Sequence, residues 1–140
     1  MARILLVEDE ENLCLLYQAE LGMEGHEVTY VRDGKSAVEV VRNERPDLVI
    51  MDLSLPEKMD GLESMSRILS EDKSIPVIIN TGYSQYRDNF LSWAAEAYVV
   101  KSADLSHLKE TINKVLGERQ KAAEDAASGS PGTDDASVQV

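Results

Sequence analysis

Short apolar runs alternate along this chain with segments of helical periodicity, and this alternation limits the fold more than any other feature of the sequence. Five such runs occur, at residues 4–7, 27–31, 48–51, 77–80 and 97–100. Three of the five are continuously apolar, which is typical of parallel strands that helices cover on both faces. The run at 27–31 alternates better between apolar and polar residues, so we expect it nearer an edge of the sheet.

The segments between the runs carry apolar residues three and four positions apart, as amphipathic helices do. Their expected inner faces are Leu13, Leu16, Tyr17 and Leu21, then Ala37, Val40 and Val41, then Leu62, Met65, Ile68 and Leu69, and finally Leu105, Leu108, Ile112, Val115 and Leu116. The segment 84–95 has only a partial stripe. The whole pattern predicts an α/β fold of the (βα)5 type, a doubly wound parallel sheet with helices on both faces.

The ends of these helices also carry signals. Asp33 or Gly34 could open the second helix, and Asp60 with Glu63 has the spacing of a capping box for the third. We expect the last helix to begin with Asp104 as its N-cap and to stop at Gly117.

The C-terminal segment differs in composition from everything before it. Residues 121–140 contain no aromatic residue, Leu or Ile, but include two glycines, a proline and five alanines. Such a segment buries too little apolar surface to offset the entropy lost on ordering. We therefore predict one domain over residues 1–119 and a disordered tail over 120–140, with a frayed extension of the last helix through Ala127 as the alternative.

Charge and cysteine content exclude several classes of partner. The formal net charge is −12, and no run of basic residues offsets it, which disfavours direct contact with nucleic acid. The single Cys14 excludes an internal disulfide and a cysteine zinc cage and accords with a reducing compartment. No segment approaches the roughly 20 apolar residues of a membrane span. We expect a cytoplasmic protein without a membrane partner.

Acidic residues gather where the first and third runs end. Glu8 and Asp9 follow the first run, and Asp52 directly follows the third. If the strand order is 2-1-3-4-5, these runs are neighbours and the three carboxylates meet at the carboxyl end of the sheet. Carboxylates so close repel one another unless a cation lies among them, and donors that are all oxygen favour Mg²⁺ or another hard ion. Alternatively, Asp9, Glu10 and Glu11 simply cap and charge the first turn of a helix.

Thr81 and Lys101 stand at the ends of the fourth and fifth runs. A hydroxyl and an ammonium on the same rim as a metal-bound carboxylate suit phosphoryl transfer. Thr81 would donate a hydrogen bond, Lys101 would offset phosphoryl charge, and Asp52 is placed as the nucleophile. Taken separately, Thr81 is equally well a turn residue and Lys101 a surface charge. The acids after the first run disfavour a flavodoxin-like phosphate cradle.

Together these residues resemble the receiver domain of two-component response regulators, over roughly residues 2–118. The segment 51–56, followed by Met59, Asp60 and Gly61, is similar to the phosphorylation loop of that family. The resemblance implies a flavodoxin-like sheet of five strands in the order 2-1-3-4-5. It also implies roles for particular residues. Asp52 would be the phosphoacceptor, Thr81 the switch hydroxyl, Tyr98 the aromatic switch and Lys101 the site lysine. The metal ion would be Mg²⁺, or Mn²⁺ as a substitute. Its ligands would be Glu8, Asp9, Asp52 and the backbone carbonyl of Ser54.

Three features depart from the family pattern. The loop after Asp52 is one residue longer than usual, at Lys58 or a neighbour. Ser102 stands where the family usually has a proline in a cis peptide, so we expect a trans bond there, because a cis bond without proline costs about 3 kcal/mol. Glu8 replaces the more frequent aspartate with a longer side chain.

The resemblance implies a phosphorelay role in signal transduction. A histidine kinase or phosphotransfer protein would donate the phosphoryl group to Asp52, and a downstream protein target would then recognise the face built from the fourth helix, fifth strand and fifth helix. The domain would catalyse only its own phosphorylation and dephosphorylation, as a stand-alone receiver or as a piece of a longer protein.

Three alternatives stay open. A degenerate receiver would bind partners without phosphorylation, as Ser102 and the longer loop favour. A metal-dependent phosphohydrolase with an aspartyl nucleophile usually has a second acid two residues later, where this chain has Ser54. Tyr98 could be an edge aromatic that packs on the last helix rather than a switch.

Overall fold

The structure is a computed structural model that describes residues 2–53, 61–82 and 94–128. Its strands are β1 (Arg3–Val7), β2 (Glu27–Val31), β3 (Leu48–Met51), β4 (Val77–Thr81) and β5 (Ala97–Val100). Its helices are α1 (Glu11–Met23), α2 (Gly34–Glu44), α3 (Gly61–Glu71) and α5 (Ser106–Ser128). Each expected apolar run is a strand, and only β1 and β4 extend one residue beyond the expected limits.

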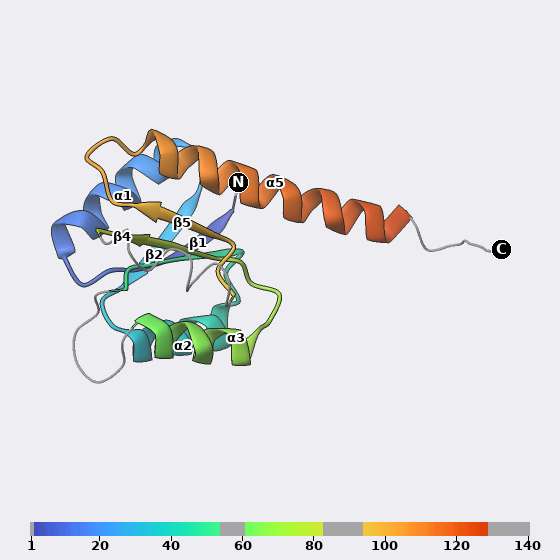
Figure 1. Ribbon diagram of the computed structural model, residues 1–140, viewed down its shortest axis with the longest axis horizontal. Helices are drawn as coiled ribbons and strands as arrows, with labels where there is room; N and C mark the ends of the chain where they lie inside the picture. The colour runs from blue at the N-terminus through green and yellow to red at the C-terminus, as the bar shows by residue number, and fades with distance from the viewer. Residues whose placement is uncertain (1, 54–60, 83–93, 129–140) are drawn as a thin grey trace.

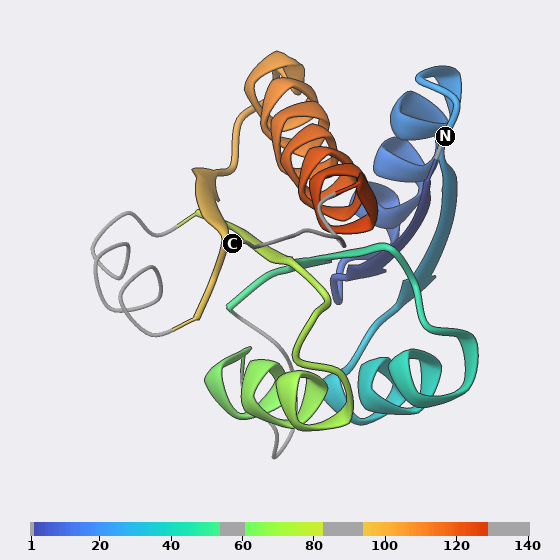
Figure 2. The same ribbon diagram turned by 90° about the vertical axis from the view of Figure 1, so that its right-hand side faces the viewer.

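The strands form one parallel sheet in the order β2-β1-β3-β4-β5, which confirms the predicted topology and places β2 at an edge. Helices α1 and α5 cover one face, and α2 and α3 cover the other (Figures 1 and 2). In this topology β1 and β3 are neighbours at the centre of the sheet, so the loops that follow them lie side by side.

Each face of the sheet packs its own hydrophobic core, because successive side chains of a strand point to opposite faces. Ile4 and Leu6 of β1 pack toward α1 and α5, whereas Leu5 and Val7 pack toward α2 and α3. Strand β3 is completely buried along its length, as its unbroken apolar run predicts. The central strands are therefore fixed from both sides, which gives the loops at their carboxyl ends a rigid base.

Helix α1 buries a different stripe from the one expected. Cys14, Tyr17 and Leu21 are buried, but Leu16 is 42% exposed, so its assignment to the inner face is wrong. The helix is rotated so that the small, apolar thiol of Cys14 faces the sheet. Asp33 is the N-cap of α2, as predicted, and its side chain accepts a hydrogen bond from the amide of Ser36 at 2.7 Å.

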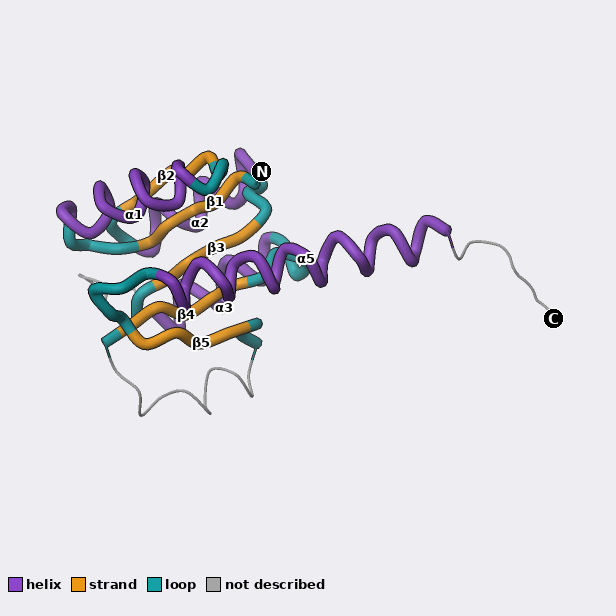
Figure 3. The backbone as a smooth tube through the Cα atoms, turned by 90° about the horizontal axis from the view of Figure 1, so that it is seen from above, coloured by secondary structure: helices purple, strands orange, loops and turns teal. Residues whose placement is uncertain are grey.

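Helix α5 continues well past its expected end. Asp104 accepts a hydrogen bond from the amide of Ser106 at 2.9 Å, as a capping residue should, but the helix does not stop at Gly117 and runs to Ser128. Residues 120–128 are thus helical rather than a disordered tail, which supports the alternative of a helical extension. The cause is the run of strong helix formers after Gly117, chiefly Ala, Glu, Lys and Gln. This part of α5 projects beyond the sheet (Figure 3).

Several expectations fall outside the described residues. These are the helix at 84–95, the Asp60 half of the capping box and the tail beyond Ser128. Within the described part of the chain, no helix is long and apolar enough to cross a membrane.

Candidate functional site

Three carboxylates meet at the carboxyl ends of β1 and β3, as the strand order predicts. Glu8, Asp9 and Asp52 each offer an oxygen, and these oxygens all lie within 4.8 Å of one another. Glu8 is only 2% exposed and Asp52 only 5%. A buried carboxylate is costly unless a cation or hydrogen-bond donors stabilise it, so this cluster needs positive charge.

Lys101 supplies positive charge from the end of β5. Its Nζ lies 2.7 Å from Oε1 of Glu8 and 2.8 Å from Oδ2 of Asp52. Burial alone would lower the pKa of Lys101, but the hydrogen bonds to Asp52 and Glu8 outweigh it and raise this pKa above its ordinary value. Burial raises the pKa of Glu8, and Lys101 partly opposes that rise. Lys101 therefore stays charged and holds the two carboxylates together.

The loop that carries the acids is fixed by neighbouring groups. The amide of Glu10 donates to Oε2 of Glu8 at 3.1 Å, and the thiol of Cys14 donates to the Glu8 carbonyl at 3.2 Å. Arg32 Nε donates to the carbonyl of Asp9 at 3.0 Å. The N-cap of α1 is Glu10, which makes no side-chain capping bond. Glu11 lies in the first turn of α1, as the alternative predicts, whereas the Asp9 carboxylate lies in the cluster with Glu8 and Asp52.

Thr81 ends β4 beside this cluster of charges. The residue is completely buried, and its Oγ1 has no hydrogen-bond partner in the part of the chain that the structure describes. The backbone amide of Lys101 donates to the Thr81 carbonyl at 2.7 Å, which ties the two residues together. A buried hydroxyl without a partner is costly, and it leaves a donor available for an incoming anionic oxygen.

Tyr98 lies in the core rather than on the last helix. Its side chain is 3% exposed and packs in the cluster between the sheet and helices α2 and α3. The neighbouring Val99 packs on the opposite face with α5. The alternative in which Tyr98 is an edge aromatic against α5 is therefore wrong.

Two of the three departures from the family pattern, at Glu8 and Ser102, lie within the described residues. No cis peptide bond occurs among the described residues, so the Lys101–Ser102 bond is trans, as expected, and Lys101 still reaches both carboxylates. Ser54, whose carbonyl was expected to bind metal, and Lys58 in the longer loop lie outside the described residues.

The donor set fits a hard divalent cation. All three clustered groups are carboxylates, and Mg²⁺ is typically bound through one or two carboxylates together with waters and a phosphate. The net charge of the three acids also exceeds what Lys101 alone neutralises. These residues could thus hold Mg²⁺ without any soft donor.

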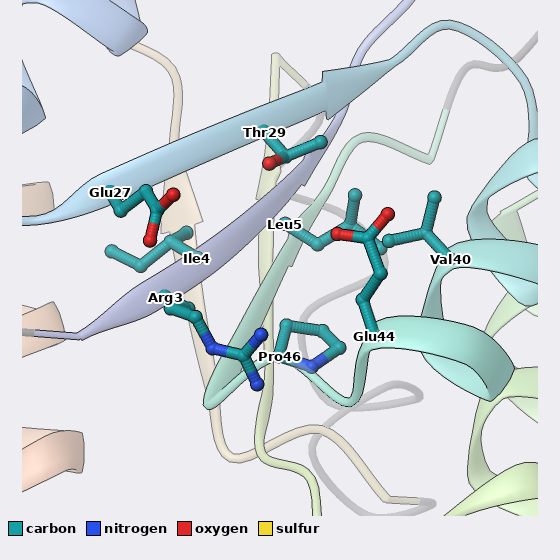
Figure 4. A pocket seen from close by; sticks show the side chains of 8 residues that line it. All are labelled: Arg3, Ile4, Leu5, Glu27, Thr29, Val40, Glu44 and Pro46. Carbon is teal, nitrogen blue, oxygen red and sulfur yellow. The ribbon is translucent and has the colours of Figure 1, made fainter.

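A small hollow lies at the other end of the sheet, beside Arg3, Glu27 and Glu44 (Figure 4). Its volume is about 50 Å³, enough for a few water molecules. The guanidinium of Arg3 donates to the carbonyl of Arg45 at 2.7 Å and is already engaged. This hollow does not compete with the carboxylate cluster as a ligand site.

Comparison with known proteins identifies the family that has this arrangement. The sequence profile of the response regulator receiver domain matches residues 4–113. The chain belongs to this family. Membership in this family accounts for the five-stranded parallel sheet.

Relatives with known names are similar over most of this receiver domain. Response regulator ArlR of Staphylococcus saprophyticus is 36% identical over 118 residues, which cover 83% of this chain and 53% of ArlR. Regulatory protein AtoC of Escherichia coli K12 is 31% identical over 116 residues, which cover 81% of this chain and 25% of AtoC. The chain thus spans about half of one relative and a quarter of the other.

Solved structures show the same fold. The response regulator TrrA of Thermotoga maritima, in complex with Mg²⁺ and BeF, is 40% identical, with a TM-score of 0.76, and the match covers 81% of this chain and 98% of TrrA. TrrA is also known in complex with the histidine kinase ThkA, again at 40% identity and a TM-score of 0.76, over 83% of this chain and 99% of TrrA.

Sequence reasoning missed two polar residues next to the site. Tyr17 donates from its hydroxyl to Oδ1 of Asn80 at 2.6 Å, and both residues are buried. The helical spacing predicts Tyr17 only as part of an apolar stripe, and the strand pattern predicts Asn80 only as the end of an apolar run. The signal is an amide that directly follows three Val and Ile residues in a buried strand.

Proposed function

We propose that this receiver domain accepts a phosphoryl group on Asp52 in an Mg²⁺-dependent reaction. The donor would be the phosphohistidine of a histidine kinase or a phosphotransfer protein. One observation carries the proposal: Lys101 Nζ lies 2.8 Å from the Asp52 carboxylate, and at the end of the adjacent strand lies the hydroxyl of Thr81, which has no partner among the described residues. A nucleophile, a cation and a hydrogen-bond donor thus converge on one rim of the sheet.

The proposed transfer forms one O–P bond and breaks one P–N bond. A lone pair of an Asp52 carboxylate oxygen forms the new O–P bond, while the P–N bond of the phosphohistidine breaks. The electron pair of that bond returns to the imidazole nitrogen, which takes up a proton. Lys101 and Thr81 would stabilise the negative charge on the phosphoryl oxygens, and their positions are set before the donor arrives.

Glu8, Asp9 and Asp52 would hold Mg²⁺, together with the backbone carbonyl of Ser54. When bound, the cation offsets charge on the phosphoryl oxygens and the carboxylates, and Mn²⁺ could substitute for it. Glu8 has a longer side chain than aspartate, yet its carboxylate lies within the same cluster. The Mg²⁺ in the TrrA complex supports this assignment.

We further propose that the new phosphoryl group acts as a switch. Its oxygens would accept a hydrogen bond from Thr81, and the resulting movement would shift the packing of Tyr98 and so the face that includes β5 and α5. Such a shift changes the populations of existing conformations rather than creating a new one. The ThkA–TrrA complex supports a kinase as the upstream partner, and the downstream partner would be another protein in the cytoplasm.

One experiment tests the proposal directly. The protein is incubated with acetyl phosphate and Mg²⁺, and its intact mass is measured. We expect a gain of one phosphoryl group that is lost in Asp52→Asn and kept in Asp47→Asn, since Asp47 is an exposed aspartate just before β3. The gain should also disappear in EDTA.

Each alternative gives a different result in this experiment. A protein that takes up no phosphoryl group would be the degenerate receiver. Steady release of phosphate from generic monoesters over many turnovers would indicate the phosphohydrolase. The trans bond before Ser102 leaves Lys101 within reach of both carboxylates, so that departure no longer favours a degenerate site.

A further inference from the structure

Asn80 is a buried polar residue that has no part in the chemistry proposed above. Within the described residues, the buried polar side chains are Glu8, Asp52, Ser64, Asn80 and Thr81. Glu8, Asp52 and Thr81 form the site, and Ser64 lies on α3. Asn80 is 3% exposed in the middle layer of the molecule, where an apolar side chain would avoid the cost of burying an amide.

Both ends of the Asn80 amide are engaged. Its Oδ1 accepts a hydrogen bond from the hydroxyl of Tyr17 at 2.6 Å, and its Nδ2 donates to the carbonyl of Val99 at 3.0 Å. Tyr17 belongs to α1, Asn80 to β4 and Val99 to β5. The three groups therefore form a buried polar link from a helix through one strand to the next.

This link lies next to Thr81 and Lys101, the two residues that would donate to the phosphoryl group. Asn80 immediately precedes Thr81 in β4, and Val99 follows Tyr98 in β5, two residues before Lys101. Three residues before Tyr17, on the same face of α1, the thiol of Cys14 donates to the Glu8 carbonyl at 3.2 Å. One face of α1 thus contacts the acidic loop through Cys14 and strand β4 through Tyr17.

We propose that Tyr17 and Asn80 are positioning residues for phosphoryl acceptance. Their hydrogen bonds fix the spacing between the acidic loop after β1 and the donors at the ends of β4 and β5. This inference rests on the proposed function, because it concerns how fast Asp52 is phosphorylated.

The need for such a link follows from the topology. Strand β5 is at an edge and, among the described residues, pairs only with β4, yet Lys101, which directly follows β5, must reach Asp52 after β3. The side chain of Asn80 adds a bond to the Val99 carbonyl beside the backbone ladder of β4 and β5, and Tyr17 ties this bond to α1. Small displacements matter here, since a misplacement of about 1 Å at a reacting centre can slow a reaction by about 10²-fold.

The test compares Tyr17→Phe with the wild-type protein. This change keeps the ring in the core but leaves Oδ1 of Asn80 without its donor. At saturating acetyl phosphate and Mg²⁺ we expect phosphorylation of Asp52 to slow by about tenfold, less than the effect of a full 1 Å displacement. The Mg²⁺ dissociation constant, measured by calorimetry, should change little, because the carboxylates keep their own anchors. Ile112→Val, in the same core but away from the link, is the control and should keep the wild-type rate.

The outcomes separate the two proposals. If the wild-type protein takes up no phosphoryl group, the proposed function fails and this inference fails with it. If the wild-type protein is phosphorylated and a folded Tyr17→Phe variant matches its rate within twofold, only the positioning role is wrong. A merely structural bond would lower the melting temperature without changing the rate of the folded protein.

A second measurement needs no variant and covers the case in which Tyr17→Phe does not fold. The side-chain amide signals of Asn80 are followed by NMR in the wild-type protein while Mg²⁺ and beryllofluoride are added. We expect these signals to shift as the site fills. Unchanged signals in a protein whose Thr81 amide does shift would overturn the inference.

Discussion

Replacing Lys101 by Met should destabilise the metal-free protein by an amount that depends strongly on pH. The variant keeps most of the aliphatic stem but loses the ammonium that lies 2.7 Å from Glu8 and 2.8 Å from Asp52. Both carboxylates are almost completely buried, so neither gains much from water when the ammonium is removed. Removing one partner of a buried ion pair typically costs about 3–5 kcal/mol.

The loss of folding free energy is limited by the cost of protonating one of the two carboxyl groups. The ordinary pKa of a glutamate is 4.5, so holding Glu8 protonated at pH 7 costs about 1.36 × 2.5, or about 3.4 kcal/mol. At pH 5 the same step costs about 1.36 × 0.5, or about 0.7 kcal/mol. We therefore expect the variant to lose about 3 kcal/mol at pH 7 and about 1 kcal/mol at pH 5.

The direction follows from proton linkage. In the variant, burial raises the pKa of Glu8 without opposition from Lys101, so the folded protein binds a proton that the unfolded chain has released above pH 4.5. The free energy of unfolding must then fall as the pH rises from 5 to 7. The wild-type protein should show less of this fall, since Lys101 favours the ionised form of Glu8.

Urea denaturation at pH 5, 6 and 7 in EDTA measures these values. Lys109→Met is a suitable control because Lys109 also lies 2.8 Å from a carboxylate, that of Glu20, but the Glu20 side chain is 38% exposed, so water screens this pair and its loss should matter little. Added Mg²⁺ should restore much of the stability of Lys101→Met by supplying another cation. A loss at pH 5 equal to that at pH 7 would show that the buried charges do not interact as argued.

Three further predictions concern groups away from the phosphoryl chemistry. Burial and the charge of Glu8 raise the pKa of Cys14 from 9.0 to about 11, so the folded protein should react with a thiol reagent at pH 8 about 10²-fold more slowly than the urea-unfolded chain. Gly117→Ala should raise the free energy of unfolding by about 0.5–1 kcal/mol in urea, because no atom crowds the new methyl group in the middle of α5. Asp33→Ala should lower it by about 1 kcal/mol, while Asp33→Asn still accepts the Ser36 amide and should lose much less.

The sheet and the charged part of the site could be predicted from sequence because both depend on where strands end. Parallel strands place their carboxyl ends at one edge, so Glu8, Asp52 and Lys101 had to lie near one another once the strand order was assumed. No knowledge of side-chain rotation was needed for that step.

Other features depend on how α1 is rotated about its axis and on the competition between residues that end a helix and residues that continue it. Leu16 and Cys14 both fit an apolar stripe on α1, and only packing against the sheet decides which of them is buried. The bond between Tyr17 and Asn80 joins residues 63 positions apart and requires one particular rotation of that helix. At Gly117 a stop signal competes with strong helix formers on its C-terminal side, and a glycine within a helix costs only about 1 kcal/mol.

The ion pairs of Lys101 with Glu8 and Asp52 also affect the local unfolding of the sheet. An edge strand is ordinarily the first part of a sheet to fray, because it has a neighbour on one side only. Here, detaching β5 from β4 would also withdraw the ammonium from two buried carboxylates, after β1 and β3 at the centre of the sheet. Fraying at the edge is thereby coupled to unfavourable charge at the centre. In native-state hydrogen exchange, the amide of Lys101, bonded to the Thr81 carbonyl, should exchange together with the core of the sheet rather than with its margin.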